Sequence, residues 1–225
     1  MKVAFAQLNY VIGDFEGNAQ KIISFIHKAK NENADLVIFS ELSVTGYYPH
    51  DLLEKKEFIE KADIAVHKIA KHCRGIAAIV GAPRINQSER GKKLFNSAFF
   101  LNDGKIESVH NKTLLPTYDI FDEYRHFEPN REFKLVGYKG EKIAITICED
   151  LWDFQPVENT FAKNQLYNIT PMKQLIEHKP DFILNIAASP FSYTKIWGRK
   201  NIFIRNAKQY NLPIFNVNQA GAQTE

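Results

Sequence analysis

The apolar positions along the chain alternate between two spacings, one typical of strands and one typical of helices. Short apolar runs predict strands at residues 3–8, 36–39, 76–80, 143–147, 182–186 and 213–217. Apolar residues three or four positions apart predict helices over residues 18–30, 55–72, 170–178 and 197–209. Strands that alternate with helices in this way are typical of layered α/β folds.

One further pair of strands is predicted to be antiparallel. Residues 96–101 and 105–110 flank Asn102-Asp103-Gly104, and an Asp-Gly turn between two strands is typical of a β-hairpin. The sheet structure is therefore expected to be mixed. The sequence contains no internal repeat, low-complexity tract or linker, so we predict one domain over residues 1–225.

The last residues of the chain follow a predicted strand without a further element. Residues 212–225 run from the apolar segment LPIF into the polar segment NQAGAQTE. A natural terminus and a fragment of a longer protein would both have this pattern, and we favour the fragment.

Charge and composition exclude several classes of function. The 225 residues include 29 Lys and Arg and 26 Asp and Glu, a net charge of +3 that is scattered along the chain. Binding to nucleic acid or to an anionic membrane is therefore not expected. No stretch approaches the roughly 18 apolar residues of a membrane-spanning helix. Two cysteines cannot form a disulfide framework, so we expect a reducing compartment, the cytoplasm.

Candidate functional residues follow the predicted strands, because sites in open α/β sheets form where strands end. Glu41 follows the strand at 36–39, and Lys112 follows the second hairpin strand. Cys148 and Glu149 follow the strand at 143–147, and Ser189 follows the strand at 182–186.

Cys148 has two interpretations. A free cysteine is most often a small buried hydrophobic residue, and Cys73 is expected to be one. Cys148 instead stands at a strand end before two acids, a setting that suits an exposed nucleophile. A thiol with a pKa of about 8.5 needs a neighbouring base or cation to react at neutral pH. Lys112 is the candidate cation and Glu41 the candidate base, although each could also be an ordinary surface residue.

Metal chemistry is not predicted by the sequence. The seven histidines are dispersed, and neither an HExxH motif nor Cys/His ligand spacing occurs. Phosphate-binding glycine motifs are also absent from the sequence.

Three separated segments resemble one known family. FSELSVTGY (39–47), HNKTLLPTYDIFDEYRHF (110–127) and ITICEDLW (145–152) are similar to the nitrilase, or carbon–nitrogen hydrolase, superfamily. The resemblance implies a catalytic triad of Glu41, Lys112 and Cys148. It also implies an α/β fold, the nitrilase-like four-layer α-β-β-α sandwich with mixed sheets.

Within this superfamily the chain is most similar to the glutaminase domains of glutamine-dependent NAD synthetases. The discriminating segments are KTLLPTYDIFDEYRHF, CEDLW, NIAASPF and NQAGAQTE. The resemblance implies hydrolysis of the L-glutamine side-chain amide through a thioester on Cys148. It further implies glutamine-binding roles for Tyr118, Glu149, Ser189 and Lys195.

The same resemblance implies partners outside this chain. Ammonia would pass to a C-terminal synthetase domain, absent from these residues, that uses ATP and Mg²⁺ to convert deamido-NAD to NAD. No cofactor is implied for the glutaminase domain itself, and a homo-oligomer is expected. Two alternatives stay open: a free-standing amidase or carbamoylase of the same superfamily, and a catalytically silent assembly domain.

Overall fold

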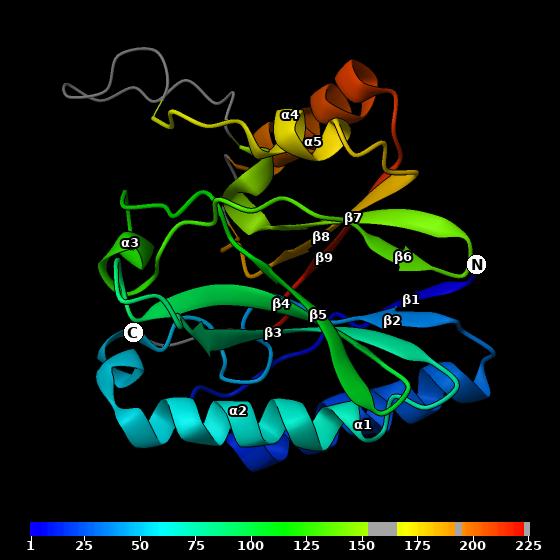
Figure 1. Ribbon diagram of the computed structural model, residues 1–225, viewed down its shortest axis with the longest axis vertical. Helices are drawn as coiled ribbons and strands as arrows, with labels where there is room; N and C mark the ends of the chain where they lie inside the picture. The colour runs from blue at the N-terminus through cyan, green and yellow to red at the C-terminus, as the bar shows by residue number, and fades with distance from the viewer. Residues whose placement is uncertain (153–165, 192–194, 223–225) are drawn as a thin grey trace.

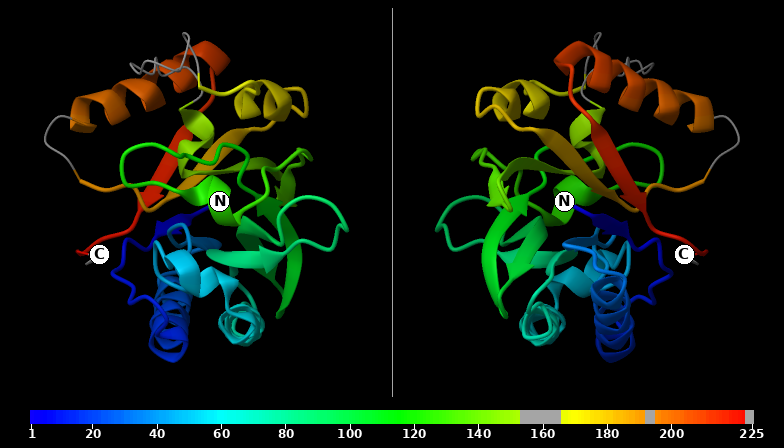
Figure 2. Two further views of the ribbon diagram at one scale, coloured as in Figure 1. Left: turned by 90° about the vertical axis from the view of Figure 1, so that its left-hand side faces the viewer. Right: turned by 90° about the vertical axis from the view of Figure 1, so that its right-hand side faces the viewer.

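The computed structural model describes residues 1–152, 166–191 and 195–222, with the side chains of 195–197 outside the description. Two sheets lie face to face, and helices cover the outer face of each (Figure 1). The two side views in Figure 2 show the same order of layers, helix, sheet, sheet and helix. The predicted α-β-β-α sandwich is therefore confirmed.

The first sheet has five strands in chain order. They are β1 (Val3–Phe5), β2 (Leu36–Ile38), β3 (Ala77–Ile85), β4 (Leu94–Asn102) and β5 (Lys105–Asn111). The first three strands are parallel, and β4 and β5 are added antiparallel. Asn102 pairs with Lys105, and Asp103 and Gly104 between them have positive φ angles of 50° and 77°. These angles fit the two-residue turn that the sequence predicts, so the hairpin and the mixed sheet are confirmed.

The second sheet has four strands. They are β6 (Val136–Tyr138), β7 (Glu141–Ile147), β8 (Phe182–Ala187) and β9 (Ile214–Asn218). β6 pairs antiparallel with β7, whereas β7, β8 and β9 are parallel. The pattern did not predict β6, because Gly137 interrupts its apolar residues Val136 and Tyr138.

The helices cover the sheets with their apolar faces. Helices α1 (Phe15–Asn31) and α2 (Lys56–Ala70) pack on the first sheet, and α4 (Pro171–Ile176) and α5 (Lys195–Tyr210) pack on the second (Figure 1). Three short helices lie near the strand ends: η1 (His50–Glu54), α3 (Glu123–His126) and η2 (Cys148–Leu151). None of the helices in the described residues has the length and apolar character needed to cross a membrane.

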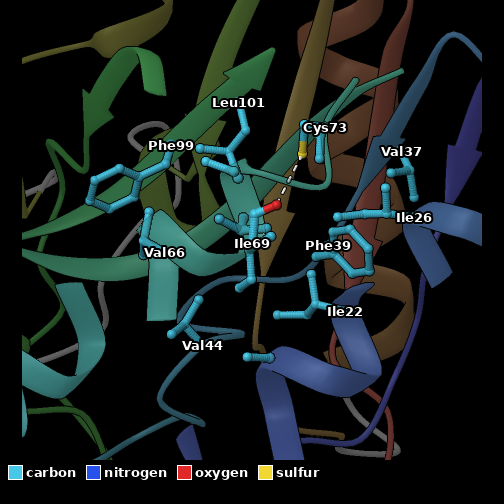
Figure 3. Close-up of a cluster of buried hydrophobic side chains, with 14 of the residues drawn as sticks. Ile22, Ile26, Val37, Phe39, Val44, Val66, Ile69, Cys73, Phe99 and Leu101 are labelled. Carbon is cyan, nitrogen blue, oxygen red and sulfur yellow. Dashed lines mark hydrogen bonds between the residues drawn. The ribbon is translucent and has the colours of Figure 1, made fainter. Parts of the chain in front are cut away.

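Separate apolar clusters hold the layers together. Figure 3 shows the cluster between the first sheet and its helices, with Ile22 and Ile26 of α1 and Val66 and Ile69 of α2. A second cluster joins the facing sides of the two sheets, and its largest members include Leu36, Ile38, Phe100, Ile145 and Leu184. Burial of this kind contributes roughly 25 cal/mol for each Å² of apolar surface removed from water. The sheets are thus fixed relative to one another, and so are the residues at their strand ends.

Candidate active site

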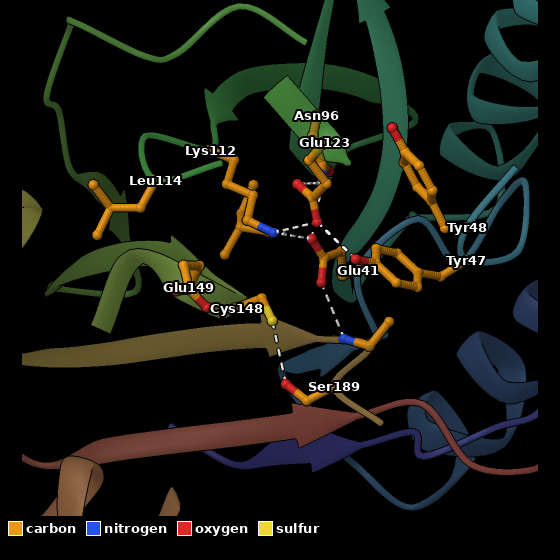
Figure 4. A network of polar contacts seen from close by, with 12 residues as sticks. Glu41, Tyr47, Tyr48, Asn96, Lys112, Leu114, Glu123, Cys148, Glu149 and Ser189 are labelled. Carbon is orange, nitrogen blue, oxygen red and sulfur yellow. Dashed lines mark hydrogen bonds and ion pairs between the residues drawn. The ribbon is translucent and has the colours of Figure 1, made fainter. Parts of the chain in front are cut away.

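The predicted residues at the strand ends meet in one buried centre between the sheets (Figure 4). The first sheet contributes Glu41, which follows β2, and Lys112, which follows β5. The second sheet contributes Cys148 at the end of β7 and Ser189 after β8. These four strands run in the same direction within their sheets, so their carboxyl ends reach the same side of the sandwich.

A buried lysine between two carboxylates forms the charged part of the centre. Lys112 Nζ lies 2.7 Å from Glu41 Oε1 and 2.7 Å from Glu123 Oε1. All three side chains are completely buried. Such a cluster is stable only when each charge has a partner, because an isolated ion in a protein interior costs several kcal/mol. The Glu41 and Glu123 charges raise the pKa of Lys112 well above its usual value, against the effect of burial.

Two further donors fix the carboxylate of Glu41. The side-chain amide of Asn96 donates to Glu41 Oε1 at 2.8 Å, and the backbone N–H of Ala188 donates to Oε2 at 3.1 Å. Each oxygen of Glu41 is therefore held from a different sheet, since Asn96 belongs to β4 and Ala188 follows β8. The carboxylate can neither rotate nor move away without losing these bonds.

Cys148 occupies a sharp turn between β7 and η2. Its φ angle is +44°, in the left-handed region that costs a non-glycine residue energy. The thiol sulfur lies 3.2 Å from Ser189 Oγ. Burial and the Glu41 carboxylate raise the pKa of the Cys148 thiol well above its usual value, while Lys112 and the Ser189 hydrogen bond act in the opposite direction. The cation that the sequence predicts is present, yet the net effect of the surroundings is to raise the pKa of the thiol.

Asp150 ties the turn of Cys148 to the segment of Lys112. Its Oδ1 accepts the backbone N–H groups of Thr113 and Leu114, and its Oδ2 accepts that of Ile147, each at 2.9 Å. Burial raises the pKa of Asp150 to about 6, and the three N–H donors act against this rise. The bonds connect two strand ends that belong to different sheets.

Three of the four predicted substrate-binding residues, Tyr118, Glu149 and Ser189, lie near the thiol. Tyr118 OH donates to Glu149 Oε1 at 2.7 Å, and Tyr167 OH donates to the same oxygen at 3.0 Å. Ser189 is held by Asn218, which accepts its N–H at 2.8 Å and donates to its carbonyl at 3.0 Å. Lys195 is the first residue of α5, and its side chain lies outside the described residues, so its predicted contact stays a prediction.

A cavity of about 570 Å³ opens beside the centre. Tyr47, Ala188 and Ser189 lie in its wall, together with Phe121 and Arg199. The hydroxyl of Ser189 lies 3.2 Å from the sulfur of Cys148, so the cavity wall is in direct contact with the thiol. Its walls combine aromatic rings with a few polar groups, as in most small-molecule sites.

Glu123 and Asn96 are parts of the centre that the sequence did not predict. Glu123 lies on α3, a helix of four residues without a readable spacing, and also accepts the Tyr47 hydroxyl at 2.7 Å. Burial raises its pKa to about 7. The available signal was an acid among the aromatic residues of YDIFDEYRHF, a segment where a solvated glutamate is not expected. Asn96 sits within a strand, and no sequence signal distinguishes it.

One group of side chains in the described part of the chain has the spacing of metal ligands. Ligand atoms of Asp51, Glu54 and His126 lie within 4.8 Å of one another. The guanidinium of Arg125 lies 3.1 Å from Asp51 Oδ1 and 3.5 Å from Glu54 Oε1. A cation is thus already present between these acids, and the group is separate from the thiol.

The sandwich and the Glu–Lys–Cys arrangement at its strand ends are those expected of a hydrolase of carbon–nitrogen bonds. Comparison with known families agrees, since residues 2–153 match the carbon-nitrogen hydrolase family. The chain belongs to this family.

The names of its relatives describe a narrower group within this family. The chain is 37% identical over 227 residues to glutamine-dependent NAD(+) synthetase of Synechocystis sp., covering 99% of this chain and 40% of that protein. For the enzyme of the same name from Thermotoga maritima the identity is 33%, with 100% and 36% covered. The structure of the glutamine-dependent NAD+ synthetase from Acinetobacter baumannii superposes with a TM-score of 0.84 at 35% identity, covering 98% of this chain and 38% of that one.

The chain therefore spans about two fifths of the length of these relatives. An amidase from Nesterenkonia sp. AN1 superposes with a TM-score of 0.77 at 17% identity, covering 98% of this chain and 79% of that one. At this identity the likeness concerns the fold alone.

Proposed function

We propose that this chain hydrolyses the side-chain amide of L-glutamine and supplies the ammonia for ATP-dependent amidation of deamido-NAD to NAD. The observation that carries the proposal is the buried Glu41–Lys112 pair beside the Cys148 thiol, in a chain whose relatives are named glutamine-dependent NAD synthetases. The synthetase step belongs to a C-terminal domain with its own ATP and Mg²⁺. A homo-oligomer completes the proposal.

The first half of the reaction forms a thioester. Cys148 Sγ attacks the amide carbon of glutamine while the thiol proton moves to Glu41. Since burial and Glu41 keep the pKa of the thiol high, this proton leaves as the sulfur–carbon bond forms rather than beforehand. The tetrahedral intermediate then breaks its carbon–nitrogen bond, and Glu41 returns the proton to the departing nitrogen as ammonia.

The second half restores the enzyme. Glu41 takes a proton from a water molecule, whose oxygen attacks the glutamyl thioester. The carbon–sulfur bond breaks, the sulfur recovers its proton from Glu41, and glutamate leaves. One water is consumed, and one ammonia and one glutamate are produced.

Lys112 is suited to stabilise the oxyanion of both intermediates. An ammonium group has three N–H donors, and two of them are used on Glu41 and Glu123. The third is available for the substrate oxygen, and the backbone N–H of Glu149 would add another donor. One such donor is typically worth about 3–4 kcal/mol in the transition state. Glu123 acts as a positioning residue that holds Lys112 in place.

The glutamine head group requires an acid and a base near each other. Glu149 would receive the ammonium group, with its carboxylate held by Tyr118. Lys195 would bind the carboxylate group, and Ser189 would contact the substrate beside the thiol.

The test is substitution of the nucleophile in the intact protein. Cys148→Ala is expected to reduce ammonia release from glutamine at least about 10³-fold, because no other described residue can form the thioester. Cys73→Ala is the matched control, with activity expected within twofold of wild type. Wild-type turnover in Cys148→Ala would end the proposal. Faster hydrolysis of a simple aliphatic amide than of glutamine would favour the free-standing amidase instead, and the absence of any labelling of Cys148 by a glutamine-like diazo-ketone would favour a silent domain.

A further inference from the structure

Tyr167 reaches the same carboxylate oxygen as Tyr118, although no sequence pattern predicted a role for it. The two hydroxyls donate to Glu149 Oε1 at 3.0 and 2.7 Å. Within the described residues no donor reaches the other oxygen, Oε2. Burial raises the pKa of both tyrosines, so their hydroxyls are protonated and can only donate to the carboxylate.

Among the described residues, one oxygen of the buried Glu149 carboxylate accepts two hydroxyls and the other accepts none. An ionised carboxylate offers about four acceptor positions, so Glu149 can accept further donors. The nearby cation, Lys112, is already bonded to Glu41 and Glu123. No ion pair within the described part of the chain includes Glu149, and an ammonium group of a ligand would supply one.

We propose that Tyr167 is a positioning residue that, with Tyr118, fixes Glu149 so that Oε2 receives the α-ammonium group of the substrate. The site then selects amides that carry an α-ammonium group over the same amide without one. This inference rests on the proposed glutaminase function. It adds that the α-ammonium group of the substrate determines specificity and that Tyr167 helps to position its acceptor.

The experiment compares two substrates that differ only in that group. L-Glutamine and 4-carbamoylbutanoate have the same amide and the same carboxylate, and only glutamine has the ammonium group. For the wild-type protein we expect kcat/KM to be about 100-fold higher for glutamine, since a buried partner left unbonded penalises the analogue. Tyr167→Phe should lower kcat/KM for glutamine about tenfold, mainly through KM, and change that for 4-carbamoylbutanoate less than twofold.

A matched control removes a tyrosine hydroxyl elsewhere. Tyr138 OH donates to the carbonyl of Asp35 at 3.0 Å, outside the centre. Tyr138→Phe should leave both substrates unchanged, and thermal unfolding of both variants reports on folding. An equal loss for both substrates in Tyr167→Phe would mean a merely structural role and overturn the inference, as would no loss for glutamine.

The pH dependence gives a second readout. Among the described residues, the titratable groups that face Glu149 are Tyr118, Tyr167, Lys112, Glu41 and the neighbouring thiol of Cys148. Burial raises the pKa of Glu149, and the tyrosine hydroxyls lower it by bonding the ionised form. Removing the Tyr167 hydroxyl should therefore move the acid limb of kcat/KM for glutamine to higher pH. The limb for 4-carbamoylbutanoate should not move, because this substrate has no ammonium group for Glu149 to bind.

Wild-type protein alone separates this inference from the proposed function. Turnover of neither substrate would overturn both. Turnover of both substrates with less than tenfold discrimination would leave the amide hydrolysis intact and overturn only the role of Glu149 and Tyr167. This comparison also decides the matter if Tyr167→Phe does not fold.

Discussion

The two cysteines of the chain are both buried and both free, yet their surroundings differ completely. Cys73 follows α2 and packs among apolar side chains, with its thiol 3.6 Å from the carbonyl of Ile69 (Figure 3). Burial alone raises its pKa to about 12. Cys148 lies beside Ser189, Glu41 and Lys112 at the centre between the sheets (Figure 4).

The comparison shows that neither burial nor the pKa distinguishes a nucleophile in this fold. Burial raises the pKa of both thiols. What differs is the presence of a carboxylate that can take the proton and of a cation that can stabilise the product of attack. The backbone differs as well, since Cys148 is held at a φ angle of +44° and Cys73 is absent from the residues with positive φ. The reactivity proposed for Cys148 therefore depends on its neighbours.

Removing the cation should have the largest effect on this contrast. In Lys112→Met the carboxylates of Glu41 and Glu123 would lie buried without a shared cation, at a cost of about 3–5 kcal/mol in the free energy of unfolding. Glutamine hydrolysis should fall at least about 10³-fold, because the donor to the oxyanion is lost as well.

Chemical denaturation and ammonia release measure these two effects. Lys68→Met, which removes an exposed lysine paired with Glu16, is the control and should change neither. If Lys112→Met kept more than a tenth of the wild-type activity, the activity of Cys148 would not depend on Lys112. The neighbouring cation would then not explain the difference between Cys148 and Cys73.

The sequence predicted the parts of the centre that depend on strand ends. Glu41 and Cys148 follow apolar runs long enough to be recognised, and Lys112 follows a strand that the Asp-Gly hairpin turn predicts. Glu123 and Tyr167 depend instead on a four-residue helix and on a segment after the second sheet's β7, where spacing carries no information. The same holds for β6, whose apolar residues are interrupted by Gly137. Elements with an uninterrupted apolar pattern were predictable, and those fixed by tertiary contacts were not.

Differential alkylation should sharpen the contrast between the two thiols. Iodoacetamide is expected to modify Cys148 about 100-fold faster than Cys73, because Cys148 lies beside the cavity and has Glu41 to accept its proton. Cys73 is fully enclosed and has only the Ile69 carbonyl nearby. Mass spectrometry of peptides after timed quenching measures both rates. Glutamine should slow the reaction of Cys148 alone. Equal alkylation rates for the two thiols would contradict the prediction that Cys148 is the more accessible and more reactive of the two.

The smallest expected effect is a change in stability, and it arises at Cys73 rather than at Cys148. Cys73→Ala removes one buried sulfur from the cluster of α1, α2 and the first sheet, and a small cavity of this kind costs about 1 kcal/mol. Its glutamine hydrolysis should stay within twofold of wild type, since no residue of the centre contacts Cys73. Denaturant unfolding measures the first value and ammonia release the second. Cys73→Ala could instead lose more activity than its lower stability accounts for. That result would show that the helix-covered core influences the thiol of Cys148, and the two regions could no longer be treated as independent.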